Sequence, residues 1–377
     1  MNAAGIIFSN LNNNTLSRLT ADRTVAAIPF ACRYRLIDFA LSNMVNADIS
    51  EINVVANYNF RSLLEHIGSG KDWDLARRSG GINFISPYQA AHTPNAKLYS
   101  SHLEALRSIT DSYIETLKKE YVILSDADFI CNIDLEDVLR VHKEKNADVT
   151  VVAVPVKDGF SAKTPKLMLK ADDDDCVTAM TMSDGNVPGY TYLSANIFVL
   201  KTSYLLELLR IAEQHDYKSF LRDLLMPRVS DRHIFLYRHL GYFASVSSFC
   251  DYFTYSIALT KDAALRASLL GIPERPIFTN VHNSPPVLYR DGAVVRNSMI
   301  ADGCVIEGTV ENSILFRGVK VKKGAVVKNS VLFFGTEVGE NTTLNCIIAD
   351  KHVSVSSGIT LSGHETIPFF IGKGRKI

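Results

Sequence analysis

A short repeat in the C-terminal part of this sequence is the feature that most limits how the chain can fold. Four copies of a phrase that starts with asparagine begin 15, 17 and 16 residues apart, at Asn297, Asn312, Asn329 and Asn345. Aliphatic residues also recur at every sixth position around these copies. Three six-residue steps make one coil of a triangular parallel β-helix, whose inward aliphatic side chains stack from coil to coil. An antiparallel sandwich does not require this spacing. We therefore expect a parallel β-helix over residues 287–377, an architecture that commonly serves in subunit assembly.

The first 267 residues show a different pattern, in which short apolar strands alternate with amphipathic helices. Such alternation predicts βαβ units and a mostly parallel sheet, that is, a Rossmann-like α/β domain. The clearest strands are expected at 3–8, 51–56, 121–125, 149–156 and 193–200, and helices at 37–46, 60–67, 101–118, 135–145, 203–213 and 249–259. Glycine and proline residues then interrupt regular structure, and we place a linker at 268–286.

Composition and charge exclude several classes of protein. The 377-residue chain is 47% hydrophobic and carries 40 basic and 40 acidic side chains. This balance gives no electrostatic basis for binding nucleic acid or an anionic membrane. No apolar run approaches the ~20 residues that a membrane span needs, and the N-terminus lacks the pattern of a signal peptide. The six cysteines and ten histidines form no metal-ligand motif. We expect a cytoplasmic protein that binds neither nucleic acid nor membrane.

One N-terminal stretch resembles a known family. The sequence reads DRTVAAIPF at residues 22–30 and YRLIDFALSN at residues 34–43. This resembles the ADP-glucose pyrophosphorylases (glucose-1-phosphate adenylyltransferases), in which the stretch reads GGxGxRLxxLTxxRAKPAVPF followed by (Y/F)RIIDFALSN. The resemblance spans almost the whole chain. It implies a nucleotidyltransferase (GT-A-like) domain followed by a left-handed parallel β-helix.

The resemblance also shows what the chain has lost. The family joins ATP and glucose 1-phosphate, with Mg²⁺, to give ADP-glucose and pyrophosphate. That chemistry needs glycines beside the triphosphate, an arginine and a lysine that offset phosphoryl charge, and carboxylates for the metal. The positions that have lost the family's residue are Asn10, Leu11 and Asn13 in the glycine loop, Thr15 for the arginine, Val25 for the RAKP lysine, Met182 in the sugar-phosphate motif and Ser245 for the second metal aspartate.

Three positions are interpreted as remnants of ligand binding. Asp128 matches the family's first metal aspartate, Arg23 matches the RAKP arginine, and Glu104 lies in the helix start that approaches nucleotide and sugar. Asp126 shares a strand face with Asp128, which leaves a weak Mg²⁺ site open at this point. The acidic run Asp172–Asp175 is more typical of a solvated turn than of a metal site.

Arg33 and Arg35 cluster near the altered loop. They could bind an anionic effector, either a sugar phosphate or a nucleotide, because guanidinium groups recognise phosphate well. A solvated or ion-paired surface role is an equally good interpretation.

The combined losses predict a catalytically deficient chain. Removing one electrostatic stabiliser typically costs about 10² to 10³ in rate, while the fold-determining phrases here remain intact. The pattern is similar to the GlgD-type regulatory subunits, which implies pairing with a homologous catalytic subunit, with a heterotetramer as precedent. We expect no cofactor of the chain's own, and Mg²⁺ only through that partner. Two alternatives remain: a weakly active adenylyltransferase, with Arg18 replacing the lost arginine, or a sugar-phosphate sensor without turnover.

Overall fold

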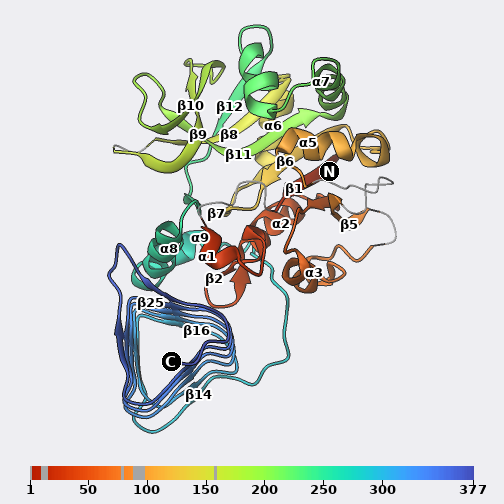
Figure 1. The fold of residues 1–377 in the computed structure, drawn as a ribbon. Coiled ribbons are helices and arrows are strands. Elements are labelled where there is room, and N and C mark those ends of the chain that lie inside the picture. Colours follow the sequence, from red (N-terminus) through yellow and green to blue (C-terminus); the bar gives the residue numbers. More distant parts are fainter. Residues whose placement is uncertain (1, 10–15, 78–79, 88–97, 157–158) are drawn as a thin grey trace.

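A computed structural model of the chain describes residues 2–9, 16–77, 80–87, 98–156 and 159–377. Figure 1 shows an α/β domain in the upper part of the view and a triangular stack of strands in the lower part, with α8 (Phe249–Lys261) and α9 (Ala263–Leu270) between them. The predicted order of an α/β domain followed by a parallel β-helix is confirmed. None of the helices within the described residues has the length and apolarity needed to span a bilayer.

A nine-stranded sheet of described residues organises the α/β domain. Its path is β10-β9-β11-β6-β1-β4-β5, with β8 beside β11 and β12 beside β8. The strands are β1 (Ala3–Phe8), β4 (Glu51–Val55), β5 (Gly81–Ile85), β6 (Tyr121–Asp126), β8 (Val149–Pro155), β9 (Ser161–Ala171), β10 (Val177–Gly185), β11 (Tyr192–Lys201) and β12 (Ile234–Arg238). The run β6-β1-β4-β5 is parallel, whereas β11 is antiparallel to β6, β8 and β9.

The two central strands determine where a site can form. All six residues of β1 are buried, which explains its continuous apolar sequence. Because β1 and β6 are parallel and Phe8 pairs with Asp126, both strands end at the same edge of the sheet. Loops at that edge are the usual place for a ligand in α/β folds.

Helices cover both faces of the sheet and form two separate cores. One core includes α5 (His102–Ser108) and α7 (Thr202–Gln214), and the other includes α2 (Leu36–Asn46), α3 (Arg61–Ile67) and α6 (Leu135–Glu144). α2 begins after Arg35, whose backbone N–H donates to the Asp38 carboxylate at 3.0 Å. Such a side-chain acceptor satisfies an otherwise unpaired N–H in the first turn. Smaller elements are α1 (Ser17–Thr20), β2 (Pro29–Phe30), β3 (Tyr34–Arg35), β7 (Phe129–Cys131) and β13 (Phe243–Ser245).

Two expected boundaries differ from the structure. The helix expected over 101–118 ends at Ser108 and is followed by a π-helical turn at Thr110–Ile114. The hydroxyls of Ser108 and Thr110 donate back to backbone carbonyls of the preceding turn, which bends and weakens a regular helix. α9 also continues to Leu270, into the segment expected to be linker, and the irregular chain begins at Gly271.

The β-helix consists of three parallel sheets of five strands each. The sheets are β14 (Leu288–Tyr289), β17 (Val305–Ile306), β20 (Lys320–Val321), β23 (Glu337–Val338) and β26 (Ser354–Val355); β15 (Val294–Arg296), β18 (Thr309–Glu311), β21 (Val326–Lys328), β24 (Thr343–Asn345) and β27 (Thr360–Ser362); and β16 (Met299–Ile300), β19 (Ile314–Leu315), β22 (Val331–Leu332), β25 (Ile347–Ala349) and β28 (Phe369–Ile371). Aliphatic residues stack inside, for example Ile306, Val321 and Val338 in successive coils. The sixfold spacing in the sequence therefore predicted most of this interior, although Val294 in the first coil is exposed and its neighbour Val295 packs inward.

The asparagine phrase marks one corner of the β-helix, with a shift in its fourth copy. Asn297, Asn312 and Asn329 adopt left-handed backbone conformations with φ of 42°, 47° and 44°. Asparagine tolerates this region better than most residues. In the next coil Cys346, and not Asn345, occupies the corner, because Asn345 pairs with Lys328. The last step between corners is therefore 17 residues instead of the 16 expected from the phrase.

The two domains share one hydrophobic core. Residues of the segment 16–39 and of α8 pack against one face of the β-helix, where Phe316 and Phe333 are buried. Within this interface Arg23 Nη2 lies 2.6 and 2.9 Å from the two carboxylate oxygens of Asp350, and both side chains are almost fully buried. The Arg23 guanidinium also lies 5.7 Å from the centre of the Phe333 ring. The β-helix therefore packs against the first domain through a shared hydrophobic core.

We predict that Arg23→Met lowers the free energy of unfolding by about 3–5 kcal/mol, because it leaves the Asp350 carboxylate buried without its partner. The double variant Arg23→Met/Asp350→Leu should recover part of this loss, since no unpaired charge remains. Urea unfolding followed by circular dichroism measures both. The control Lys320→Met removes an exposed ion pair with Glu337 and should cost less than about 1 kcal/mol. A loss for Arg23→Met no larger than the control would contradict this account.

Candidate functional site

A pocket of about 500 Å³ opens at the edge where β1 and β6 end. Its floor is apolar and includes Phe8, Leu124 and Phe198 from the sheet. The polar side chains that line it include His102 at the start of α5, Asp126 at the end of β6, Asp128 just after that strand, Lys166 on β9, Asn196 on β11 and Arg222 in the helical turn Phe220–Leu225. Pockets of this size and mixed character at such a sheet edge are typical sites for small ligands.

One side of the pocket is a hydrogen-bonded chain around Asp126. His102 Nε2 lies 2.6 Å from Asp126 Oδ1, and Asn196 Nδ2 donates to Asp126 Oδ2 at 2.9 Å. Asn196 reaches this position from an irregularity in β11 between Ser194 and Ile197, where its φ is 55°. Both oxygens of the Asp126 carboxylate are therefore engaged by donors of the same chain.

The charge of Asp126 acts on His102. Burial lowers the pKa of the His102 imidazole, but the adjacent Asp126 carboxylate and its hydrogen bond outweigh that effect, so the net pKa is raised. Phe8 holds the imidazole from the side, edge to face, with ring centres 4.7 Å apart. His102 and Asp126 thus form a hydrogen-bonded pair in the wall of the pocket.

The other side of the pocket is centred on Lys166. Its Nζ donates to Ser245 Oγ at 3.1 Å and lies 4.0 Å from Asp128 Oδ2. Burial raises the pKa of the Asp128 carboxyl even though the Lys166 ammonium opposes that shift. β13 pairs antiparallel with β7, and Val246 N donates to the Asp128 carbonyl at 2.7 Å. Backbone pairing therefore holds Asp128 and Ser245 close together around one cation.

Comparison with known proteins shows the family to which this chain is related. Residues 6–239 match the model of nucleotidyl transferases, and residues 288–365 match that of GlmU-like C-terminal hexapeptides. The glycogen biosynthesis protein GlgD of Bacillus subtilis (strain 168) is 33% identical over 374 residues, covering 98% of this chain and 95% of that protein. GlgD of Geobacillus stearothermophilus is 33% identical over 334 residues, covering 86% and 82%. The glucose-1-phosphate adenylyltransferase of Thermosipho africanus (strain TCF52B) is 30% identical over 330 residues, covering 87% and 78%.

This chain belongs to the ADP-glucose pyrophosphorylase family. Its similarity to GlgD proteins and to glucose-1-phosphate adenylyltransferases supports a role in glycogen biosynthesis.

The structure brings several of the altered family positions into the pocket. Val25 and Met182 line it with apolar side chains. Asp128 also lines it, and Ser245 accepts a hydrogen bond from Lys166, which is another lining residue. The positions Asn10, Leu11, Asn13 and Thr15 lie outside the described residues.

Two of the expected ligand-binding remnants are engaged elsewhere. Arg23 faces the β-helix, where it pairs with Asp350. The Glu104 carboxylate accepts hydrogen bonds from the backbone N–H and hydroxyl of Ser100, at 2.7 and 2.6 Å, while its own N–H donates to Ser101 Oγ. Glu104 thus caps the start of α5, as a glutamate at the third position of a helix commonly does.

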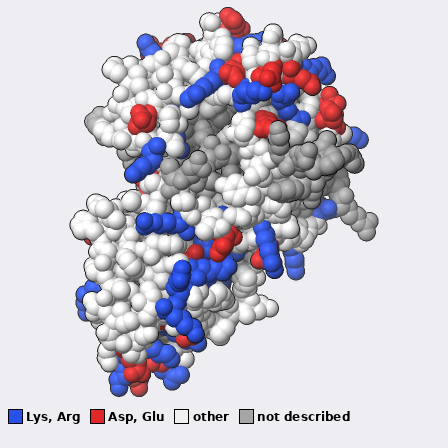
Figure 2. All heavy atoms as spheres, in the orientation of Figure 1, with Lys and Arg blue, Asp and Glu red and all other residues white. Residues whose placement is uncertain are grey.

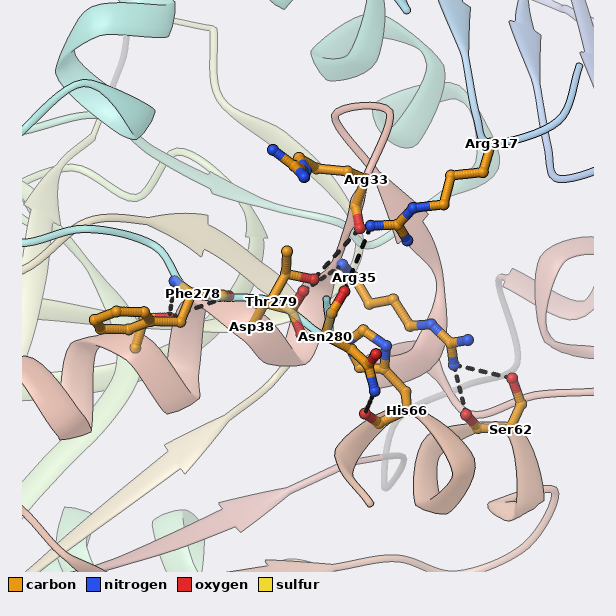
Figure 3. A network of polar contacts seen from close by, with 10 residues as sticks. Arg33, Arg35, Asp38, Ser62, His66, Phe278, Thr279, Asn280 and Arg317 are labelled. Atoms are coloured by element: carbon orange, nitrogen blue, oxygen red, sulfur yellow. Dashed lines mark hydrogen bonds and ion pairs between the residues drawn. The ribbon is translucent and has the colours of Figure 1, made fainter. Parts of the chain in front are cut away.

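The two arginines expected to bind an effector lie at the domain junction (Figure 3). Arg35 Nη1 donates to the backbone carbonyl and hydroxyl of Ser62. The Arg33 side chain is exposed and points away from these contacts, while its carbonyl accepts from the Thr279 hydroxyl at 3.3 Å. Arg317 approaches the same place from the β-helix, donating to the Asn280 carbonyl at 3.4 Å.

Asp172–Asp175 form the turn between β9 and β10, where an Asp172 carboxylate oxygen accepts from the N–H groups of Asp174 and Cys176. Among the described residues, no group of three or more His, Cys, Asp or Glu side chains could hold a metal ion. The acidic run therefore acts as a hydrogen-bonded turn.

Sequence reasoning missed His102, Lys166 and Asn196 as parts of the site. His102 stands at the family's helix start and Asn196 in a strand irregularity, and either could have been suspected as an unusual polar residue next to an acidic strand end. Lys166 has no local signal, because it reaches Asp128 only through the sheet order.

We predict that the His102 pKa in the folded protein lies above its ordinary value of about 6.5, and that Asp126→Asn lowers it. A group with a raised folded pKa adds stability that is complete below its unfolded pKa and lost as the pH rises through the folded pKa. The stability advantage of wild type over Asp126→Asn should therefore be largest below about pH 6.5 and shrink as the pH rises through the folded pKa of His102.

Histidine NMR titration and urea unfolding at several pH values measure these effects. His142 is an internal control, because burial lowers its pKa to about 4 and it should not respond to the Asp126 substitution. A His102 pKa at or below 6.5 in wild type would rule out the pairing described here.

Proposed function

We propose that this chain is a catalytically deficient subunit of a bacterial ADP-glucose pyrophosphorylase. It would pair with a homologous catalytic subunit and modulate the conversion of ATP and glucose 1-phosphate into ADP-glucose and pyrophosphate for glycogen synthesis. The observation that carries the proposal is the internal pairing of the pocket's acids, Asp126 with His102 and Asp128 with Lys166.

The chemistry of phosphoryl transfer explains why this pairing matters. The reaction depends on positioned charges that stabilise the developing negative charge on the phosphoryl group. Here Val25 and Met182 present apolar surface to the pocket, and Lys166 is already engaged by Asp128 and Ser245. Losses of several such groups together leave little catalysis, even though they do not add independently.

The β-helix supports pairing with another subunit. Its first coil exposes Leu288 and Tyr289, and its last coil exposes Ile367 and Phe369. Exposed apolar groups gathered at the ends of a prism are typical of contact surfaces. A heterotetramer with the catalytic subunit is the assembly that we propose. Modulation requires that this chain bind two conformations of its partner with different affinity.

An anionic effector is part of the same proposal. Figure 2 shows Lys and Arg side chains gathered along the junction of the two domains. Burial lowers the pKa of Arg35 to about 10, with Arg23 and Arg317 adding to the effect. Burial and the nearby Arg35 and Arg23 lower the pKa of Lys351 to about 8. A sugar phosphate or a nucleotide would relieve this crowding of positive charge, which supports Arg35 as an effector contact. For Arg33, whose side chain points away from this cluster, the contact stays a prediction.

We predict no measurable ADP-glucose formation by the purified chain with ATP, glucose 1-phosphate and Mg²⁺. Mixing it with the catalytic subunit of the same organism should change that subunit's kcat or its response to sugar phosphates. The control is the catalytic subunit mixed with an unrelated protein at equal concentration.

Three outcomes separate the alternatives. Clear formation of ADP-glucose by the chain alone would contradict the proposal and favour a weakly active adenylyltransferase. Binding of a sugar phosphate by calorimetry, without any effect in the mixture, would instead favour a sensor. An unchanged partner and no binding would also contradict the proposed role.

A further inference from the structure

Two carboxylates at the carboxyl end of a strand, such as Asp126 and Asp128, are the donors that a divalent cation prefers. The family's reaction uses Mg²⁺, so these residues can be tested against a metal. They do not fit one. Both Asp126 oxygens accept hydrogen bonds from His102 and Asn196. The remaining carboxylate, Asp128, faces the ammonium of Lys166.

We propose that the Lys166 ammonium is a resident cation of this pocket, in the place that a divalent cation would need, and that any ligand of the pocket is bound without a metal ion. Nζ lies between Asp128 Oδ2 and Ser245 Oγ, at 4.0 and 3.1 Å. Positions 128 and 245 therefore converge on one point, and that point is occupied by a charged group of the chain itself. The inference rests on the proposed function, because it gives the loss of catalysis a specific cause.

The sheet register shows that positions 128 and 245 are brought together independently of Lys166. Ser245 pairs with Phe129 across β13 and β7, and Val246 N donates to the Asp128 carbonyl. These backbone contacts hold positions 128 and 245 together whatever side chain β9 contributes. Lys166 comes from a different part of the sheet, on β9, which is antiparallel to β10 and β11.

Electrostatics then excludes a second cation from the same place. An ammonium and a divalent ion repel strongly at contact distance in a partly buried site. The ammonium is covalently tethered, so it is present at every concentration of metal. Serine at position 245 offers a neutral oxygen, which accepts a hydrogen bond from the ammonium but adds no charge for a divalent ion.

Mn²⁺ binding measured by electron paramagnetic resonance tests the proposal directly. Wild type and Lys166→Arg should bind no Mn²⁺ in the pocket, whereas Lys166→Met/Ser245→Asp should bind it at least about 10-fold more tightly than wild type, because two carboxylates then face a vacated point. Adding Asp128→Asn to that double variant should abolish the gain. The matched control Lys170→Met removes an exposed lysine of the same strand and should behave as wild type.

Each result has a definite meaning. Mn²⁺ binding by wild type that disappears in Asp128→Asn would overturn the proposal, as would a folded double variant that binds no better than wild type. Circular dichroism and thermal unfolding establish that the variants fold. The titration needs no catalytic partner, so its outcome is read separately from the mixing assay that tests the proposed function.

Discussion

The packing of the β-helix against the α/β domain is the constraint on which the rest of this structure depends. One hydrophobic cluster contains residues of both domains, and the buried Arg23–Asp350 pair lies within it. The segment that supplies Arg23 also supplies Val25, which belongs to this cluster and lines the pocket. Pocket wall and domain interface are therefore parts of one short segment. A change in how the β-helix sits would be transmitted to the pocket through direct contacts.

The pocket itself resembles a structural polar network more than a poised reaction centre. Buried polar groups are costly unless each has a partner. In an active enzyme some of these polar groups have no partner until substrate or metal binds, and the resulting loss of stability is the cost of activity. Here His102, Asn196 and Lys166 supply partners from the same chain. Ser245, one of the altered family positions, is itself such a partner, because its Oγ accepts a hydrogen bond from Lys166.

The sequence predicted the fold well where the pattern is periodic. Sixfold aliphatic spacing identified most of the β-helix interior, with Val294 one residue out at its start. The phrase at Asn345 was also one residue out, because stacking of Leu344 on Val327 sets that corner. The site was predicted less completely. Asp128 follows a recognisable strand, but Lys166 and Asn196 reach the pocket through an antiparallel register and a strand irregularity. Arg23 was assigned to ligand binding, whereas the sequence gives no sign that its guanidinium faces Asp350, 327 residues away.

The arrangement of charges at the junction suggests how an effector could act on the pocket. Lys351 directly follows Asp350, the partner of Arg23, and its lowered pKa reflects burial beside Arg35 and Arg23. An anion bound there would stabilise the protonated lysine and draw the β-helix and the first domain together. Because Arg23 and Val25 are two residues apart, that force would fall on the pocket wall. Within the proposed function, this contiguous path would connect an effector at the junction to the pocket.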